Sequence, residues 1–320
     1  MSVRVTPVKK APLGKRFGKG LKQWIEVLPF IGVGMALFFA FVLYPQIKNI
    51  IIALSDYSIM PNAENPFIGL DNFKRIFTNV SKKGSDGYFF WLAFRNNMLA
   101  IVVTVPGQMI IGLLVAVMVH AITKGKTLFK IVFYIAVICD WIVVANIFTY
   151  IFQGDKGALI NYILLKLKII DAPVAWLAET WTGNAVIWIF CIWKGFGWVM
   201  IIYLAALQNV SKSYYEAAII DGANSVQQFW YITVPCIKPT TFYLLVNLIN
   251  GAMNIFIQVF LMTKGGPVGT TDVVMNYIYT RAFSYFEFGY AAACGLLMGV
   301  FVFTTSLFLK KYMRYGQLDA

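Results

Sequence analysis

Residues 211–235 read SKSYYEAAIIDGANSVQQFWYITVP and lie between two long apolar stretches. This segment holds two capping-box spacings, Ser-x-x-Glu or Ser-x-x-Gln, each of which predicts the start of a helix. The two spacings are Ser213 to Glu216 and Ser225 to Gln228. Gly222 between them suits the left-handed backbone with which many helices end. Pro235 and Pro239 are expected to end the second helix. The sequence therefore predicts two short helices, hinged at Gly222 and held against a membrane face.

The apolar stretches around this segment have the length and composition of membrane spans. Of the 320 residues, 59% are hydrophobic and only 13% are charged, and the mean hydropathy is +0.70. These values exclude a cytosolic globular enzyme, a disordered scaffold and a secreted disulfide-rich module. A span needs about 20 apolar residues, and six stretches qualify: 27–50, 96–122, 130–153, 182–206, 239–263 and 288–309. The predicted fold is an all-α membrane protein whose six transmembrane helices occupy residues 25–315, with a cytoplasmic two-helix loop at 211–235.

The basic residues indicate how these spans are oriented. The formal net charge is +13, and Lys and Arg gather beside the predicted spans in residues 1–24, 121–130 and 310–314. Because cytoplasmic segments carry an excess of Lys and Arg, we expect both termini in the cytoplasm. Residues 1–24 are expected to form a flexible tail that contacts anionic lipid headgroups. This distribution favours membrane orientation over nucleic-acid binding as the reason for the charge.

The loop also carries a set of residues at fixed spacing: Glu216-Ala217-Ala218, Gly222, Ile232 and Val234-Pro235. This set resembles the EAA loop of ABC importer permeases, whose pattern has Leu where this chain has Val234. Four further segments resemble the carbohydrate-uptake branch, which includes maltose and glycerol-phosphate permeases: 69–73, 193–195, 265–267 and 288–292. The resemblance covers about residues 27–315 and implies a type I importer fold. That branch often has proline in the third span where this chain has Ala136, so we predict a straighter helix there.

The resemblance implies a set of partners. In that family the loop docks on a cytoplasmic ATPase, which assigns coupling roles to Glu216, Ala217, Ala218, Asp221 and Gly222. The simpler alternative for Glu216, that it only caps its own helix, stays open. The expected assembly has two ATPase subunits that bind ATP and Mg, a second homologous permease that differs in sequence, and an extracytoplasmic solute-binding protein. This chain itself is expected to bind no cofactor and to lie in a bacterial cytoplasmic membrane.

The fifth predicted span carries four amides at helical spacing, Asn247, Asn250, Asn254 and Gln258. Intervals of three, four and four residues place them on one face of a continuous helix. Amides that face lipid without a partner are costly, so these must face protein or water. They either form hydrogen bonds between helices or line a translocation path. A path of neutral amides would suit a neutral, hydroxyl-rich solute such as a sugar.

Two charges lie within predicted spans, Asp140 and Lys194, and intramembrane charges are functional candidates by default. Counted from the cytoplasmic flanks, Asp140 lies roughly 15 Å deep and Lys194 roughly 25 Å deep. A direct pair between them is therefore not expected. Lys194 belongs to a Trp-Lys-Gly run common to the family, which favours a general structural role. For Asp140 a structural partner and a functional role both remain open.

The predicted function is that of a transmembrane subunit in an ATP-driven, binding-protein-dependent importer for a sugar or oligosaccharide. The chain has no Walker A sequence, so ATP hydrolysis is assigned to a partner. One His and four Cys without a CxxC spacing predict neither a metal site nor catalytic residues. A sugar phosphate or a charged oligosaccharide is the alternative substrate. An ion-coupled secondary transporter or channel is the alternative class, although it leaves the loop at 211–235 unexplained.

Overall fold

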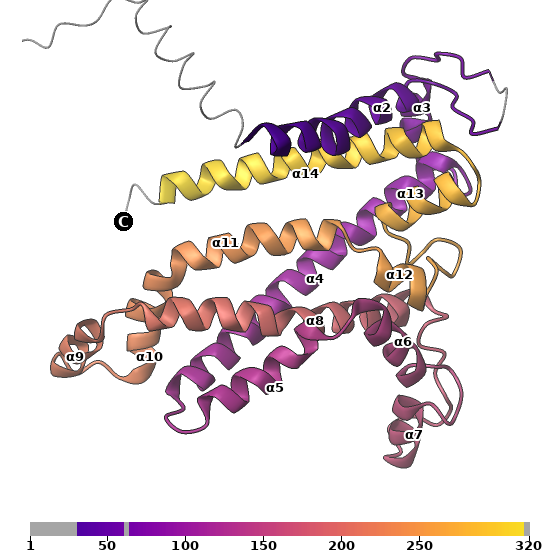
Figure 1. Ribbon diagram of the computed structural model, residues 1–320. Helices are drawn as coiled ribbons and strands as arrows, with labels where there is room; N and C mark the ends of the chain where they lie inside the picture. Colours follow the sequence, from indigo (N-terminus) through magenta and orange to yellow (C-terminus); the bar gives the residue numbers. More distant parts are fainter. Residues whose placement is uncertain (1–30, 61–63, 317–320) are drawn as a thin grey trace, which may run out of the picture. The chain divides into compact units, whose positions relative to one another are not determined.

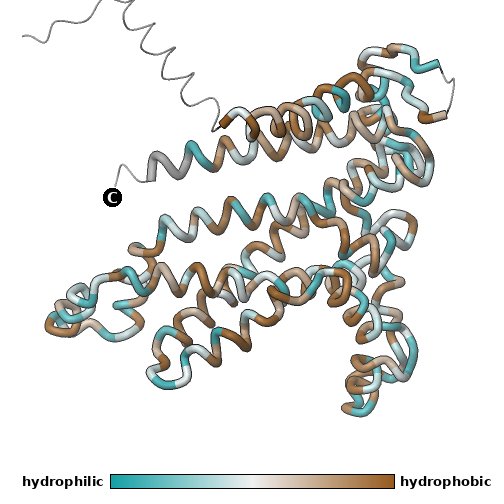
Figure 2. Tube along the Cα trace, viewed as in Figure 1, coloured by the Kyte–Doolittle hydropathy of each residue, from teal (hydrophilic) through white to brown (hydrophobic). Residues whose placement is uncertain are grey.

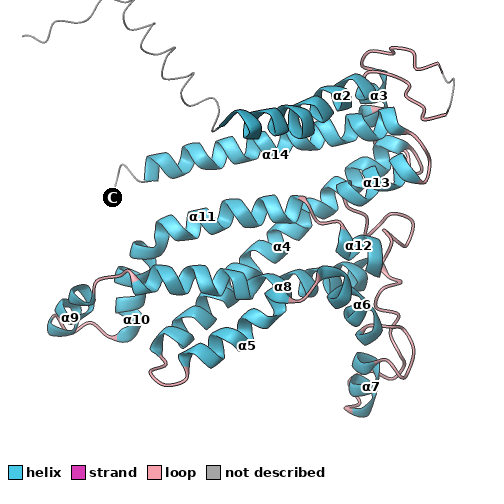
Figure 3. Cartoon of the chain, in the orientation of Figure 1, coloured by secondary structure: helices cyan, strands magenta, loops and turns pink. Residues whose placement is uncertain are grey.

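The computed structural model of the chain describes residues 31–60 and 64–316. The predicted tail at 1–24 and the first residues of the predicted span 27–50 lie outside these ranges. Every regular element within them is helical, and an isolated bridge joins Ser55 to Phe67 (Figure 3). The all-α prediction is confirmed. The chain divides into two units, residues up to 52 and residues from 53 onward, and each is described by itself.

The first unit provides one candidate span. A helix of 23 residues with a mean hydropathy of 1.7 runs over Ile31–Ala53. It includes a π-helical stretch, η1 (Phe39–Leu43), followed by α2 (Tyr44–Ala53). Its length and hydropathy are those of a single membrane crossing.

The second unit is built around α4 (Asp86–Ala121) and α8 (Thr180–Gln208), which pack along each other and against α11 (Val234–Met253) (Figure 1). Glycines allow α4 and α8 to approach closely, because a Cβ on Gly107 would meet Ile192 and one on Gly112 would meet Val199. Small residues at such contacts favour helix association in membranes. The buried core lies along this seam and is apolar: Val105, Ala116, Phe190, Val199, Met200, Tyr203 and Leu244.

The third span is broken, which corrects the expectation of a straighter helix at Ala136. α5 (Lys126–Ile138) ends at Cys139, α6 (Trp141–Ile151) begins after Asp140, and the two helices are bent by 90°. Ala136 itself stays helical; the break comes at Cys139 and Asp140, whose ψ angles of 139° and 142° are extended. The described residues therefore hold five candidate spans, or six if the bent pair counts as one.

The prolines after the two-helix loop do not end the second helix, contrary to prediction. The short helix α10 (Ser225–Gln228) continues through a π-helical turn, η2 (Phe229–Thr233), directly into α11. Pro235 lies in the first turn of α11, where a missing N–H is tolerated, and Pro239 lies inside it. In the wide turn before them, the N–H of Val234 bonds to the carbonyl of Phe229.

The fifth span breaks after α11 and resumes as α12 (Ile257–Met262). Asn97 of α4, which is fully buried, explains how the break is held. Its Nδ2 donates to the carbonyls of Ala252 at 3.0 Å and Met253 at 3.3 Å, where α11 ends. Its Oδ1 accepts from the N–H of Val274 at 2.9 Å, where α13 (Val274–Phe283) begins. One amide thus satisfies backbone groups at the ends of two helices.

The last span is α14 (Phe288–Gly316), and two short helices, α3 (Asp71–Phe77) and α7 (Leu159–Lys166), lie in the connections. The loop helix α9 (Lys212–Ile220) and α10 lie at one end of α8 and α11, while α6, α7 and α12 lie at the other (Figure 1). Hydrophobic residues run along α5 and α8, whereas hydrophilic and hydrophobic residues are mixed at α9 (Figure 2). The two ends of the bundle are therefore distinct surfaces.

Candidate functional site

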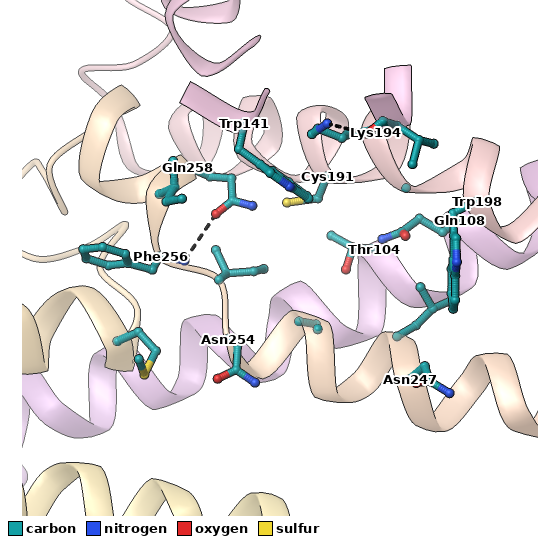
Figure 4. A pocket seen from close by; sticks show the side chains of 18 residues that line it. Thr104, Gln108, Trp141, Cys191, Lys194, Trp198, Asn247, Asn254, Phe256 and Gln258 are labelled. Carbon is teal, nitrogen blue, oxygen red and sulfur yellow. Dashed lines mark hydrogen bonds between the residues drawn. The ribbon is translucent and has the colours of Figure 1, made fainter. Parts of the chain in front are cut away.

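A cavity of about 580 Å³ opens between α4, α6, α8 and the broken fifth span. Its walls are mainly apolar and aromatic, and Trp141 and Trp198 present ring surfaces to it (Figure 4). Polar side chains from three helices and the α11–α12 break reach the same space: Thr104, Gln108, Asn247, Asn254 and Gln258. A few placed polar groups in an apolar pocket are typical of a site for a small molecule.

The structure brings three of the four predicted amides to this cavity. Because α11 ends at Met253, the four do not share one face of a continuous helix. Asn247 and Asn254 are exposed, and each donates to the carbonyl four residues earlier, at 2.8 Å and 2.7 Å. In the part of the chain that the structure describes, their side-chain oxygens accept no hydrogen bond. Gln258 is buried, and its Oε1 accepts from the N–H of Phe256 at 3.2 Å.

Asn250 lies on a different surface. Its Oδ1 accepts from the Ser306 hydroxyl of α14 at 3.1 Å. With Asn254 and the glycines of α14 it lines a separate groove of about 470 Å³. Asn250 therefore makes the hydrogen bond between helices that the sequence left as an alternative.

The side chains of Lys194 and Asp140 both bond to backbone groups at the break in the third span. The Lys194 ammonium is buried and donates to three carbonyls at the end of α5, those of Ala136 at 2.9 Å, Val137 at 3.4 Å and Cys139 at 2.5 Å. It also lies 4.6 Å from the centre of the Trp141 ring. The Asp140 carboxylate caps the other side of the break by accepting from the N–H groups of Ile142 and Val143. No ion pair joins the two side chains within residues 31–60 and 64–316, so each serves the backbone.

The loop at 211–235 has the predicted two-helix form with different caps. α9 is capped by Ser211, whose hydroxyl accepts from the N–H of Ser213. α10 is capped by Asn224, which forms a capping box with Gln227. Gly222 has the predicted left-handed backbone, with φ of +80°, and a Cβ there would meet nothing within 4 Å. A larger residue at this position is opposed by backbone strain alone.

Large apolar side chains are exposed on the outer surface of the loop. Ile220 is 86% exposed, and Ile219, Val226 and Tyr214 are also exposed. Glu216, Ala217 and Asp221 are exposed beside them, and Ala218 is half-buried. Exposed apolar patches of this kind mark surfaces that bind other proteins or a membrane.

Comparison with known proteins places this architecture. Residues 108–312 match the family described as "Binding-protein-dependent transport system inner membrane component". The chain belongs to this family. The permease is similar to the lactose transport system permease protein LacF of Rhizobium radiobacter, with 30% identity over 91% of this chain and 95% of that protein. It is also similar to the arabinooligosaccharides transport system permease protein AraP of Halalkalibacterium halodurans, with 28% identity over 89% and 85% of the two chains.

The fold agrees with a solved structure of the same architecture. A chain of a bacterial ABC transporter involved in the import of the acidic polysaccharide alginate superposes with a TM-score of 0.81. That match covers 94% of the permease and 99% of the solved chain at 23% identity. The described chain therefore has the fold of that transporter chain.

Sequence reasoning missed several residues of the cavity, Thr104, Gln108, Trp141 and Trp198. They lie inside apolar stretches, where a single amide or indole gives no periodic signal. One local signal was present in the permease sequence: Gly195 follows Lys194, and a Cβ at Gly195 would collide with the Gln108 side chain. The glycine thus makes room for Gln108 at the cavity wall.

At the end of the permease opposite α9, the loop between α12 and α13 contains a half-buried carboxylate, Asp272. Its Oδ1 accepts from the Asn276 side chain at 2.7 Å and from the N–H of Val273 at 2.9 Å. Burial raises the pKa of Asp272 to about 6, although these two hydrogen bonds lower it. Asn96 of α4 donates to the carbonyls of Thr270 and Asp272, both at 2.8 Å, and so anchors this loop to α4.

Four charged side chains at the same end of the permease form a closed ring. Arg75 pairs with Asp86 at 2.5 Å and with Glu287 at 2.6 Å. Arg281 pairs with the same two acids, at 2.5 Å and 3.0 Å. The Tyr290 ring lies 4.4 Å from the Arg75 guanidinium. Since the four residues come from α3, α4, α13 and the position just before α14, the ring joins elements distant in sequence.

Proposed function

We propose that this permease forms half of the translocation path for a sugar or oligosaccharide in an ATP-driven importer. The other half would come from a second, homologous permease of different sequence. An extracytoplasmic solute-binding protein would deliver the solute, and two ATPase subunits that bind ATP and Mg would drive transport. The observation that carries this proposal is the cavity in which neutral amides face two tryptophan rings.

The chemistry of the cavity suits a neutral, hydroxyl-rich solute. Amide side chains both donate and accept hydrogen bonds, as hydroxyl groups require, and an indole ring offers an apolar surface to the C–H face of a sugar ring. Among the described residues that line the cavity, Lys194 is the one that carries a charge, and its ammonium already donates to three carbonyls. The names of the relatives, which refer to lactose and arabinooligosaccharides, support the same class of substrate.

Two exposed amide side chains support the proposal that a second permease covers this face of the chain. Asn247 and Asn254 lie within a candidate span yet are exposed in the single chain. Polar groups at that depth are costly against lipid, so another protein or a water-filled path must cover them. A second permease that faces the cavity satisfies this requirement.

The exposed surface of α9 supports docking on an ATPase, with Glu216, Ala217, Ala218, Asp221 and Gly222 as the coupling residues. The apolar side chains around Ile220 suit burial in a protein groove. The proposal includes a cytoplasmic position, in a bacterium, for the loop and for both termini. The Asp140 carboxylate already accepts two backbone hydrogen bonds that cap α6. This role weakens the alternative of an ion-coupled transporter.

Co-purification from membranes tests the proposal. The tagged wild-type chain is expected to bring down an ATPase and a second permease, with ATP hydrolysis stimulated by binding protein loaded with a neutral sugar. Glu216→Lys is expected to lose the ATPase, whereas Asp171→Lys, an equal charge change on an exposed loop residue before α8, retains it. A chain that purifies alone and moves solute without ATP would overturn the proposal. Stimulation by charged oligosaccharides only would replace the neutral substrate with the acidic one.

A further inference from the structure

The attachment of α9 to the rest of the permease is sparse. Short connections without helical structure join it to α8 at residues 209–211 and to α10 at residues 221–224. The second connection contains Gly222 in its left-handed conformation. Among the described residues, one side-chain hydrogen bond links α9 to another helix: the Tyr215 hydroxyl lies 2.9 Å from Oγ1 of Thr233.

Thr233 is well placed to receive a displacement of α9. It is buried, with 6% of its surface exposed, and it is the last residue of the π-helical turn η2. Its hydroxyl also lies 3.4 Å from the carbonyl of Gln228, one turn earlier. The bond from Tyr215 therefore ends on the backbone turn from which α11 starts.

α11 connects this turn to the cavity without interruption. It has 20 residues, or about 30 Å at 1.5 Å per residue. Asn247 lies along it, and Asn254 caps its end at the cavity. A movement of the turn at Thr233 is thus transmitted to the amides along one helix.

Attachment at its two ends alone does not fix the rotation of a short helix about the line through those ends. A third attachment off that line removes the rotation. We propose that the hydrogen bond between Tyr215 and Thr233 is this third attachment, and that it makes a displacement of α9 move α11. This inference rests on the proposed function, in which α9 binds the ATPase, and it makes Tyr215 and Thr233 positioning residues for coupling.

The test measures sugar imported per ATP hydrolysed by the complete importer in proteoliposomes with its binding protein. Tyr215→Phe removes only the hydroxyl and Thr233→Val keeps the side-chain shape. Each is expected to lower the ratio about fivefold, the factor that corresponds to one ordinary hydrogen bond. Thr233→Ser restores a hydroxyl and is expected to keep the wild-type ratio. Tyr231→Phe, which removes an exposed hydroxyl from the same π-helical turn as Thr233, is the matched control and is expected to change nothing.

A double-mutant cycle separates this attachment from two independent effects. Residues that act through one contact are not additive, so Tyr215→Phe with Thr233→Val is expected to be no worse than either change alone. Additive losses would overturn the inference. So would a wild-type ratio in both single variants, or a loss confined to the yield and thermal stability of the complex. If the wild-type chain fails to bind an ATPase, the proposed function itself is wrong; a normal complex with an unchanged ratio refutes only the role of this bond.

Discussion

Lys194 shows how a charge inside a membrane protein can serve the backbone. A break in a membrane helix leaves carbonyls without partners, and each unpaired group is costly in lipid. The Lys194 ammonium supplies donors to three of them, while Asp140 accepts from the N–H groups on the far side of the break. The two charges thus compensate opposite ends of two helices.

Replacing Lys194 is expected to destabilise the break. Lys194→Met keeps an unbranched side chain but leaves three carbonyls without a donor, which costs about 1–3 kcal/mol. The melting temperature of the purified protein in detergent should fall clearly. Lys166→Met, which removes an exposed lysine at the end of α7, is expected to leave it within error. Equal melting temperatures for both variants would show that the capping bonds contribute nothing.

Asp272 is expected to make stability depend on pH. Its pKa in the folded protein is about 6, above the ordinary value of 3.8, so the folded state binds the proton more tightly than the unfolded state. The contribution of this proton to the free energy of unfolding is fully present below about pH 4. It declines as pH rises and is lost above about pH 6, with a slope of at most about 1.4 kcal/mol per pH unit. Asp272→Asn is expected to flatten this decline when thermal unfolding is followed from pH 4.5 to 8.

The exposed Asp171→Asn serves as the comparison for that series and is expected to follow the wild-type profile. A wild-type decline that persists unchanged in Asp272→Asn would assign the pH dependence to another group.

At the scale of the helices, breaks and bends decide how the site is built. Three interruptions matter: Cys139 to Asp140 in the third span, residues 254–256 in the fifth, and Gly222 in the loop. The first two are held by side chains from other helices, Lys194 and Asn97. The third depends on the local backbone alone, which is why it was predictable from the sequence.

The effect of a substitution at Gly222 on transport is expected to depend on the backbone conformation that the new residue can adopt. Side-chain size should matter little, because the space around Gly222 is open. Gly222→Asn tolerates positive φ and should retain ATP-driven transport. Gly222→Pro cannot reach +80°, since its ring fixes φ near −65°. It also loses the N–H that bonds to Ile219 at 3.1 Å. We expect it to abolish sugar import while the chain still reaches the membrane; uptake assays with membrane fractions measure both, and normal uptake would refute the hinge.

The sequence was sufficient for elements whose signals are local. Long apolar runs predicted α4, α8 and α14, and Gly222 predicted the hinge. The sequence did not predict elements that depend on a distant residue. The break after Cys139, for example, is stabilised by a lysine 55 residues later. The helix starts moved to Ser211 and Asn224 because several capping residues lie close together there, and their spacing alone does not choose between them. The prediction that Pro235 ends the second helix was wrong because the π-helical turn before it allows the helix to continue.

At the scale of the whole second unit, the ring of Arg75, Asp86, Arg281 and Glu287 joins its early and late segments. Arg281 is the least exposed member, at 14% of its side-chain surface. Arg281→Gln would leave both acids with one partner, and we expect a loss of about 1–2 kcal/mol, less than for a fully buried pair. Thermal unfolding in detergent measures this.

Lys74→Gln provides the matched control for the ring. Lys74 pairs with Asp71 on the same short helix, but both side chains are largely exposed, at 73% and 61%. Such pairs contribute little, so this variant should melt as the wild type does. A larger effect at Lys74 than at Arg281 would contradict a stabilising ring.

The capped break in the third span also constrains how the chain is made. A nascent polypeptide delivers residues 136–139 to the membrane before Lys194 has been synthesised, so for that interval their carbonyls have no donor. Lys194 on its own helix is equally unfavourable in the hydrocarbon, by about 2.5–3.5 kcal/mol at the centre of a span. Each span therefore supplies what the other lacks, and α5, α6 and α8 must integrate as one cooperative unit during biogenesis.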